Sequence, residues 1–332
     1  MDFSHKNSSP IQEVKDPQLE GSGVRLLIKR DDLIHEHISG NKWRKLKYNL
    51  REAAEQNHHT LLTFGGAYSN HIAATAFAAH KAGLSSIGVI RGEDDPTNPT
   101  LQFARNHGMR LHFVSREDYR RLTRVGAYGN TPVHPTDSVG ACRGTPLPPA
   151  HDALEAKFGQ FLLIPEGGAN GLGVRGCAEI LPEVEEDFDV VCCAAGTGTT
   201  LAGLALTLKE NQQLLGFPAL KGGEFLKDDV ERLIEESRLR ALSTIDYRLI
   251  TNYHFGGYAK MKPELLEFAN GFQERTGIQL DPIYTAKMMF GIYDMIRVGE
   301  YGDTLLRKGT TVLAIHTGGL QGWQGMKHRG LV

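Results

Sequence analysis

A short polar segment, Ser39–Lys42 (SGNK), is the first place where the sequence could support covalent chemistry. It follows the apolar run VRLLIKRDDL and opens an amphipathic pattern, so Lys42 is expected at the start of a helix. The positive end of the helix dipole disfavours a charged amine there and helps to lower its pKa. A neutral lysine is a nucleophile that can form a Schiff base. Taken alone, however, the tetrapeptide is more typical of a surface lysine, because Arg44, Lys45 and Lys47 follow it.

A glycine-rich segment, Ala194–Thr200 (AAGTGTT), lies between a strand-like run, DVVCCA, and a helical one, LAGLALTL. Such a segment can bind a phosphate, because its glycines let backbone amides converge and a helix N-terminus attracts anions. It is neither a Walker loop nor the GxGxxG loop of dinucleotide-binding folds. The alternative is a tight strand-to-helix turn that binds nothing.

A third segment, Gly65–His71 (GGAYSNH), again joins a strand-like run to an alanine-rich helix. Alone, Ser69 and Asn70 are best explained as caps of that helix. Ser69 does not belong to the GxSxG elbow of α/β-hydrolases, since Ala67 occupies the first glycine position. The segment therefore gains a functional meaning only in combination with others.

Two later segments complete the candidates: Asp281–Thr285 (DPIYT) opens a helix, and His316–Gly319 (HTGG) ends the last strand. A tyrosine can stack on an aromatic cofactor. A hydroxyl can meet a ring nitrogen. Taken singly, both segments are more typical of core packing and turns.

Strand-like and helical patterns alternate along most of the chain and would position these segments. The expected strands are Leu26–Lys29, Thr60–Phe64, Ile87–Ile90, Leu111–Val114, Phe161–Ile164, Val190–Ala194, Tyr247–Ile250 and Val312–His316. The expected helices are Trp43–Gln56, Asn70–Ala82, Gly173–Glu185, Thr199–Leu208, Pro263–Thr276 and Thr285–Val298. Apolar strands alternating with helices predict an α/β fold with parallel sheets covered on both faces. In such sheets ligands bind outside the carboxyl ends of the strands, where the glycine-rich segments lie.

Bulk properties describe a globular protein of about two domains. The chain has 332 residues, 40% of them hydrophobic, and a net charge of −2, so nucleic acid and membrane surfaces are not expected partners. It shows neither a membrane-length apolar stretch nor the apolar core of a signal peptide, so a cytoplasmic protein with free thiols is expected. His35 and His37 lack a third ligand, and no metal site is expected. The unpatterned segment Gly126–Ala150 is interpreted as a surface insertion in preference to a mobile lid.

Six motifs occur together in one order: SGNK, GGxxSN, PEGG (Pro165–Gly168), AGTGTT, DPxY and HTGG. In this combination the chain, from about Leu27 to Gly319, resembles the family of 1-aminocyclopropane-1-carboxylate (ACC) deaminase and D-cysteine desulfhydrase. The resemblance implies pyridoxal 5'-phosphate (PLP) as cofactor and PLP fold type II, the tryptophan-synthase-β-like fold. That fold has two α/β domains with parallel sheets and a cofactor cleft between them. The large domain would comprise 1–43 plus 159–332 and the small inserted domain 44–158, and a homodimer is expected on the same ground.

The resemblance also implies which residues hold the cofactor. Lys42 would form the Schiff base and later shuttle protons, and Asn70 would hydrogen-bond the phenolic oxygen of the ring. Thr285 or Thr317 would meet the ring nitrogen. The cofactor phosphate would be held by Gly196, Thr197, Gly198, Thr199 and Thr200.

Three further residues would face both the ring and the substrate. Tyr284 would stack on the ring or lie at its edge. Ser69 would bind the substrate carboxylate or assist at its α- or β-carbon. Tyr258, in GGYAK, matches another active-site tyrosine, although the residues after it depart from the family's Gly-x-Pro.

Two positions favour the desulfhydrase branch, because ACC deaminases have a glutamate where this chain has Thr285 and usually a glutamine where it has His71. A carboxylate keeps the pyridine nitrogen protonated and makes the ring a strong electron sink, which a hydroxyl does much less. The weaker sink still suits the loss of a good leaving group. We therefore expect α,β-elimination of a small amino acid, most simply D-cysteine to pyruvate, sulfide and ammonia. The alternatives are ACC deaminase, another PLP-dependent lyase, deaminase or racemase, and a non-catalytic protein that binds a phosphate ligand.

Overall fold

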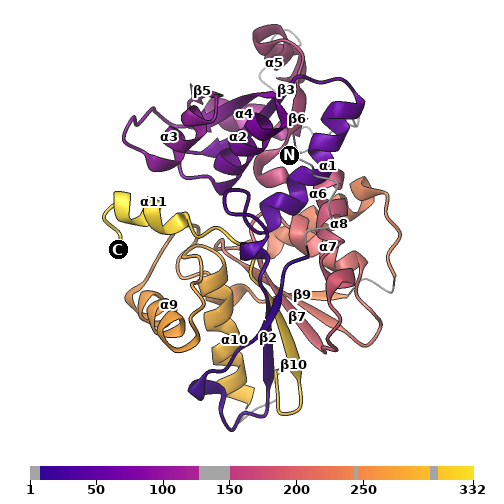
Figure 1. Ribbon diagram of the computed structural model, residues 1–332, viewed down its shortest axis with the longest axis vertical. Coiled ribbons are helices and arrows are strands. Elements are labelled where there is room, and N and C mark those ends of the chain that lie inside the picture. The colour runs from indigo at the N-terminus through magenta and orange to yellow at the C-terminus, as the bar shows by residue number, and fades with distance from the viewer. Residues whose placement is uncertain (1–7, 127–149, 243–245, 300–305) are drawn as a thin grey trace.

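A six-stranded and a four-stranded β-sheet form the framework of the part of the chain that the structure, a computed structural model, describes: residues 8–126, 150–242, 246–299 and 306–332 (Figure 1). The larger sheet has the strand order β1-β2-β10-β7-β8-β9 and is parallel except where β1 pairs with β2. Its strands are β1 (Ile11–Glu13), β2 (Arg25–Lys29), β7 (Val190–Ala195), β8 (Gln213–Pro218), β9 (Tyr247–Leu249) and β10 (Thr311–Ile315).

The smaller sheet is parallel throughout and has the strand order β5-β4-β3-β6. In Figure 1 it lies at the top, with helices α2 to α5 around it, and the larger sheet lies below. Its strands are β3 (Thr60–Gly66), β4 (Ser85–Arg91), β5 (Met109–Val114) and β6 (Leu162–Ile164).

Eleven α-helices of the described residues connect and cover the strands. They are α1 (Asn41–Glu55), α2 (Asn70–Ala82), α3 (Pro99–Asn106), α4 (Arg116–Gly126), α5 (Ala150–Phe158), α6 (Gly171–Cys177), α7 (Thr199–Leu206), α8 (Leu226–Ser237), α9 (Pro263–Thr276), α10 (Thr285–Gly299) and α11 (Gly322–His328). Short 3-10 helices are η1 (Pro17–Leu19), η2 (Asp31–Leu33), η3 (Glu166–Gly168), η4 (Leu181–Glu183), η5 (Gly223–Phe225) and η6 (Thr251–Tyr253). Figure 1 shows α11, in yellow, at the junction of the two sheet layers.

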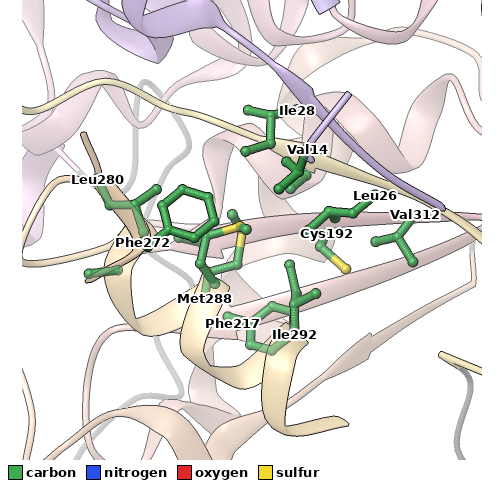
Figure 2. Packing of buried hydrophobic residues seen from close by; sticks show 14 of the residues in the cluster. Val14, Leu26, Ile28, Cys192, Phe217, Phe272, Leu280, Met288, Ile292 and Val312 are labelled. Carbon is green, nitrogen blue, oxygen red and sulfur yellow. The ribbon is translucent and has the colours of Figure 1, made fainter. Parts of the chain in front are cut away.

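The central strands of the larger sheet are buried on both faces, because successive side chains of a strand point to opposite sides. On β7, Cys192 belongs to the core cluster under α9 and α10, whereas its neighbour Cys193 belongs to the cluster under α6, α7 and α8. Figure 2 shows the first cluster, to which Cys192, Phe272 and Met288 belong. This double covering confirms the expected parallel sheet buried on both sides.

The smaller sheet is covered in the same way. Leu61 of β3 packs with residues of α1 and α2, such as Trp43 and Phe77, whereas Leu62 packs with Tyr119 of α4 and its neighbours on the other face. Helix α1 therefore belongs to the core of the smaller sheet, although it begins beside the carboxyl end of β10 in the larger sheet.

The expected strands are all present, with ends displaced by at most two residues. The helix expected over Gly173–Glu185 is wrong in extent: it ends at Cys177, and the short helix η4 follows, with Pro182 in its first turn. Strands β1 and β8 and helices α3, α4, α5, α8 and α11 were not predicted. The division into 1–43 plus 159–332 and 44–158 stays a proposal, and β6 lies after residue 158 yet pairs with β3.

Several other predictions concern single features. Cys177, Cys192 and Cys193 are free and buried, as expected. Most of the segment Gly126–Ala150, namely 127–149 with its Cys142, lies outside the described residues. Within the described ranges, no helix is both long and apolar enough to cross a membrane, and no three His, Cys, Asp or Glu side chains gather to hold a metal ion.

Candidate active site

The residues predicted from separate segments come together at one cavity of about 750 Å³. The cavity lies where the loops that follow β3, β7 and β10 approach the start of α1, as expected for a parallel α/β fold. Two predicted residues, Thr199 and Thr285, are exceptions and do not line it. Thr199 is fully buried, and its hydroxyl lies 3.0 Å from that of Thr197. The predicted residues that do line the cavity are Lys42, Ser69, Asn70, Gly196, Thr197, Gly198, Thr200, Tyr258, Tyr284 and Thr317.

Lys42 lies in the first turn of α1, held against the end of β10. The amide of Asn41 donates to the carbonyl oxygen of Thr317 at 3.1 Å, and Gly40 has φ +64°. A side chain on Gly40 would collide with that carbonyl, so glycine is required for the close approach. Burial, and then the nearby charge of Lys45, hold the pKa of Lys42 well below its usual value. A lowered pKa increases the share of the neutral amine, which is the nucleophilic form.

A buried ion cluster fixes the start of α1 to the larger sheet. Two residues beyond Lys42, the guanidinium of Arg44 donates to both carboxylate oxygens of Asp31, at 2.7 and 2.9 Å. It also donates to both oxygens of Glu183, at 2.8 Å each, and Lys29 lies 3.1 Å from Glu183. Two bidentate pairs on one guanidinium leave α1 little freedom to rotate or slide at this end.

The glycine-rich loop between β7 and α7 forms an open cradle at the N-terminus of α7. Gly198, immediately before the helix, has φ +78°, and a side chain there would meet Val230 of α8 at 2.9 Å. The hydroxyl of Thr200 accepts a hydrogen bond of 3.2 Å from Asn41, which ties the loop to the lysine segment. Free backbone amides at a helix N-terminus suit a phosphate group.

The loop after β3 presents polar atoms that lack a partner within the described structure. Ser69 caps α2 by accepting from the amide of Ile72 at 3.4 Å, as the alternative interpretation predicted, and it also lines the cavity. The side-chain oxygen of Asn70 and Nδ1 of His71 are buried and unpartnered. Nε2 of His71 lies 2.9 Å from the hydroxyl of Thr63, and burial holds the pKa of His71 well below its usual value. Unsatisfied buried polar groups are costly, so a ligand is expected to satisfy them.

Two tyrosines meet edge to face on the opposite side. The rings of Tyr258 and Tyr284 are 6.1 Å apart at 67°, and a side chain on Gly196 would touch the ring of Tyr284 at 3.1 Å. The buried carboxylate of Asp281 accepts from the amides of Ile283 and Tyr284, at 2.9 and 3.1 Å. This cap orients Tyr284 over the glycine-rich loop.

The structure distinguishes the two threonines that were candidates for the ring nitrogen. The hydroxyl of Thr285 donates to Asp281 at 2.8 Å and accepts from the Asp281 amide at 2.7 Å, and Thr285 does not line the cavity. Thr317 lines the cavity, and its hydroxyl has no recorded hydrogen bond to another described residue. The geometry therefore favours Thr317.

Sequence reasoning assigned no role to several charged residues of the cavity wall, of which Arg91, Arg116 and Glu166 lie at strand ends. Arg91 is the last residue of β4, and Arg116 and Glu166 each follow two positions after the end of β5 and β6. Their position at carboxyl ends of parallel strands was the available signal.

A lysine of lowered pKa, an anion cradle and an unpartnered amide around one cavity are features of an enzyme that uses a phosphorylated aldehyde as cofactor. The family model described as "Pyridoxal-phosphate dependent enzyme" matches residues 5–318, and the chain belongs to this family. The donor set of the cavity fits PLP: a nucleophilic amine, a phosphate cradle and an aromatic wall.

Relatives of known name agree with the resemblance. A bifunctional D-cysteine desulfhydrase/ACC deaminase of Arabidopsis thaliana is 31% identical over 95% of this chain and 77% of its own. A D-cysteine desulfhydrase of Salmonella typhi is 29% identical over 90% of this chain and 87% of its own. The solved structure of an ACC deaminase homologue superposes with a TM-score of 0.78 at 29% identity, covering 98% of this chain and 94% of that one. The fold is therefore PLP fold type II, as expected.

Proposed function

We propose that this PLP-dependent enzyme catalyses α,β-elimination of a small amino acid, with D-cysteine giving pyruvate, sulfide and ammonia. The carrying observation is that the hydroxyl residue Thr317 lines the cavity whereas Thr285 does not. Thr285 stands where ACC deaminases have a glutamate, its hydroxyl is turned to Asp281, and Glu166 is the one acid among the described residues that line the cavity. A ring nitrogen without an anionic partner supports loss of a good leaving group better than opening of a cyclopropane.

The chain's own residues supply binding and proton transfer. When bound, PLP withdraws electrons and stabilises negative charge at the substrate α-carbon. Lys42 would hold the cofactor and then, as a free amine of lowered pKa, take the α-proton. Ser69 and Asn70 would bind the substrate carboxylate and the ring oxygen, and Tyr284 would cover the ring. Tyr258, which is 44% exposed, would face the substrate side.

The test is a pyruvate assay on the PLP-loaded enzyme with D-cysteine, L-cysteine, D-serine and ACC in parallel. The proposal expects the highest kcat/KM for D-cysteine among these four. A higher kcat/KM for ACC would make ACC deaminase, the second candidate, the better assignment; the Arabidopsis relative carries both names. Racemisation without pyruvate would identify a racemase.

A non-catalytic phosphate-binding protein is the alternative from a different class. The glycine-rich cradle alone would serve it, and Lys42 would then have no role. The two functions are distinguished by adding PLP to the purified protein. The enzyme should then absorb visible light, and reduction with borohydride should abolish that absorption. A protein that binds phosphate esters without such absorption would support the binding protein.

Oligomeric state and location belong to the same proposal. We expect a cytoplasmic homodimer with a large domain of 1–43 plus 159–332 and a small one of 44–158. Light scattering coupled to size-exclusion chromatography measures the mass of the protein directly. A mass equal to that of one chain would contradict the dimer.

A further inference from the structure

The mouth of the cavity carries three arginines with no role in holding the cofactor: Arg91, Arg116 and Arg329. Two of them come from neighbouring strand ends, because Arg91 of β4 pairs in register with Gly66 of β3 and Val114 of β5, and Arg116 follows β5. Arg329, immediately after α11, lines the same cavity.

Arg91 reaches the loop that is expected to bind the substrate. A side-chain carbon placed on Gly66 would lie 3.7 Å from Nη2 of Arg91, so the guanidinium lies over the start of the segment carrying Ser69 and Asn70. The cation is thus on the substrate side of the cavity, away from the glycine-rich loop after β7.

Two of these arginines, Arg91 and Arg329, lie over aromatic rings. The guanidinium of Arg91 lies 5.3 Å from the ring centre of Tyr119, and that of Arg329 lies 5.7 Å from the ring of Tyr68. Among the described residues, none of the three arginines at the mouth has a recorded carboxylate partner. Other arginines do: Arg25, Arg30, Arg44, Arg105, Arg121, Arg232, Arg275 and Arg297. A stacked guanidinium with free N–H groups is suited to bind an oxyanion through two parallel hydrogen bonds.

The charges at the mouth do not balance. Three guanidiniums face the single carboxylate of Glu166 within the described lining. A zwitterionic amino acid cancels its own carboxylate with its ammonium group and would leave this excess uncompensated. A negative group on the substrate side chain would compensate it.

We propose, on the basis of the elimination proposed above, that the substrates are alanines whose β-substituent is itself an anion, bound by Arg91 with Arg116 and Arg329. D-Cysteine enters this class as its thiolate, and sulfate or phosphate esters of serine enter it as oxyanions. For serine O-sulfate, the Cα–H and Cβ–O bonds break and a Cα–Cβ double bond forms while the electron pair leaves with sulfate. Water then releases ammonia, so serine O-sulfate and water give pyruvate, ammonium, sulfate and a proton.

The experiment compares an anionic and a neutral substrate of the same reaction, serine O-sulfate and β-chloroalanine, both enantiomers, with the PLP-loaded protein. The variants are Arg91→Gln, Arg116→Gln and, as a control for net charge, Arg110→Gln; Arg110 is exposed near the opposite end of β5. Arg91→Gln should lower the ratio of kcat/KM for serine O-sulfate over β-chloroalanine about tenfold, the scale of electrostatic steering. Arg110→Gln should leave the ratio unchanged. Raising the ionic strength should lower the ratio for the wild type.

The outcomes separate this inference from the proposed function. A ratio that Arg91→Gln leaves unchanged, or that salt does not alter, overturns the anionic substrate class while elimination itself stands. Serine O-phosphate and D-cysteine, run in the same series, show whether phosphate, sulfate or thiolate is the preferred anion. If neither test substrate yields pyruvate, the elimination fails, and titration with 2-amino-3-phosphonopropionate decides the anion site separately. A Kd weakened about tenfold in Arg91→Gln supports the site, and an equal Kd excludes it.

Discussion

Replacing Thr285 and Thr317 in turn by valine tests which hydroxyl serves the bound cofactor and which serves the fold. Valine keeps the shape of threonine and removes the hydroxyl. In Thr285→Val, a hydrogen bond to the buried carboxylate of Asp281 is lost, which costs about 1.5–3 kcal/mol. The Asp281 amide also loses its 2.7 Å acceptor, which adds about 1–3 kcal/mol when a buried donor is orphaned. Allowing for non-additivity, we expect about 2–4 kcal/mol lower free energy of unfolding.

Thr317→Val should behave in the opposite way. Its hydroxyl has no recorded partner within the described structure, so the free energy of unfolding of the apoprotein should change by less than about 1 kcal/mol. If the hydroxyl meets the ring nitrogen, PLP affinity should fall about three- to tenfold, the value of one hydrogen bond.

Urea denaturation of the apoproteins and PLP titration followed by visible absorption measure the two effects. Thr285 belongs to the hydrogen-bonded start of α10, next to Tyr284. Thr285→Val should therefore also lose some PLP affinity, but less than Thr317→Val. The reasoning is refuted if Thr285→Val unfolds at the wild-type urea concentration and binds PLP more weakly than Thr317→Val does.

Four further predictions concern the lysines and the glycine-rich loop. Lys42→Ala should abolish visible absorption and pyruvate formation with an unchanged thermal melt, and borohydride labelling of any other lysine would contradict it. Because burial and Lys45 lower the pKa of Lys42, PLP capture by the apoprotein should accelerate with rising pH and level off well below pH ~10.5, the pKa of a free lysine. Gly198→Ala should lower the free energy of unfolding in urea by about 1–3 kcal/mol, because Gly198 has a φ of +78° and a side chain there would meet α8. It should also weaken PLP binding, and an unchanged Kd would place the phosphate elsewhere. Lys287→Met removes hydrogen bonds of 3.0 and 2.7 Å to the carbonyls of His254 and Gly257. Because the adjoining loop with Tyr258 should loosen, kcat in steady-state assays should fall by a larger factor than the affinity for PLP does.

Elements that carry their own end signals could be predicted from the sequence. Helix α2 has the predicted bounds because Ser69 caps its start and Gly83, in a left-handed conformation, ends it. Helix α9 likewise begins at Pro263 and ends before the left-handed Gly277. These signals are local, so no knowledge of the packing was needed.

Features that depend on packing were missed or left open. Strand β8 contains Gly216 and ends at Pro218, both of which weaken a strand pattern, and it is defined by pairing with β7 and β9. The sequence could name Thr199 and Thr285 as candidates, but only the fold shows that their hydroxyls bond to Thr197 and Asp281 instead of lining the cavity. A hydroxyl has no sequence signature for the direction in which it points.

The ion pairs of Arg44 have a mechanical consequence for the two halves of the molecule. Helix α1 is fastened at its first turn to Asp31 and Glu183 beside the larger sheet, yet it packs its apolar face, through Trp43, into the core of the smaller one. A rigid rotation of the smaller sheet relative to the larger one would therefore pivot close to the first turn of α1. The amine of Lys42 would lie near this pivot and be displaced little. Groups farther from the pivot, Arg91 among them, would be displaced more.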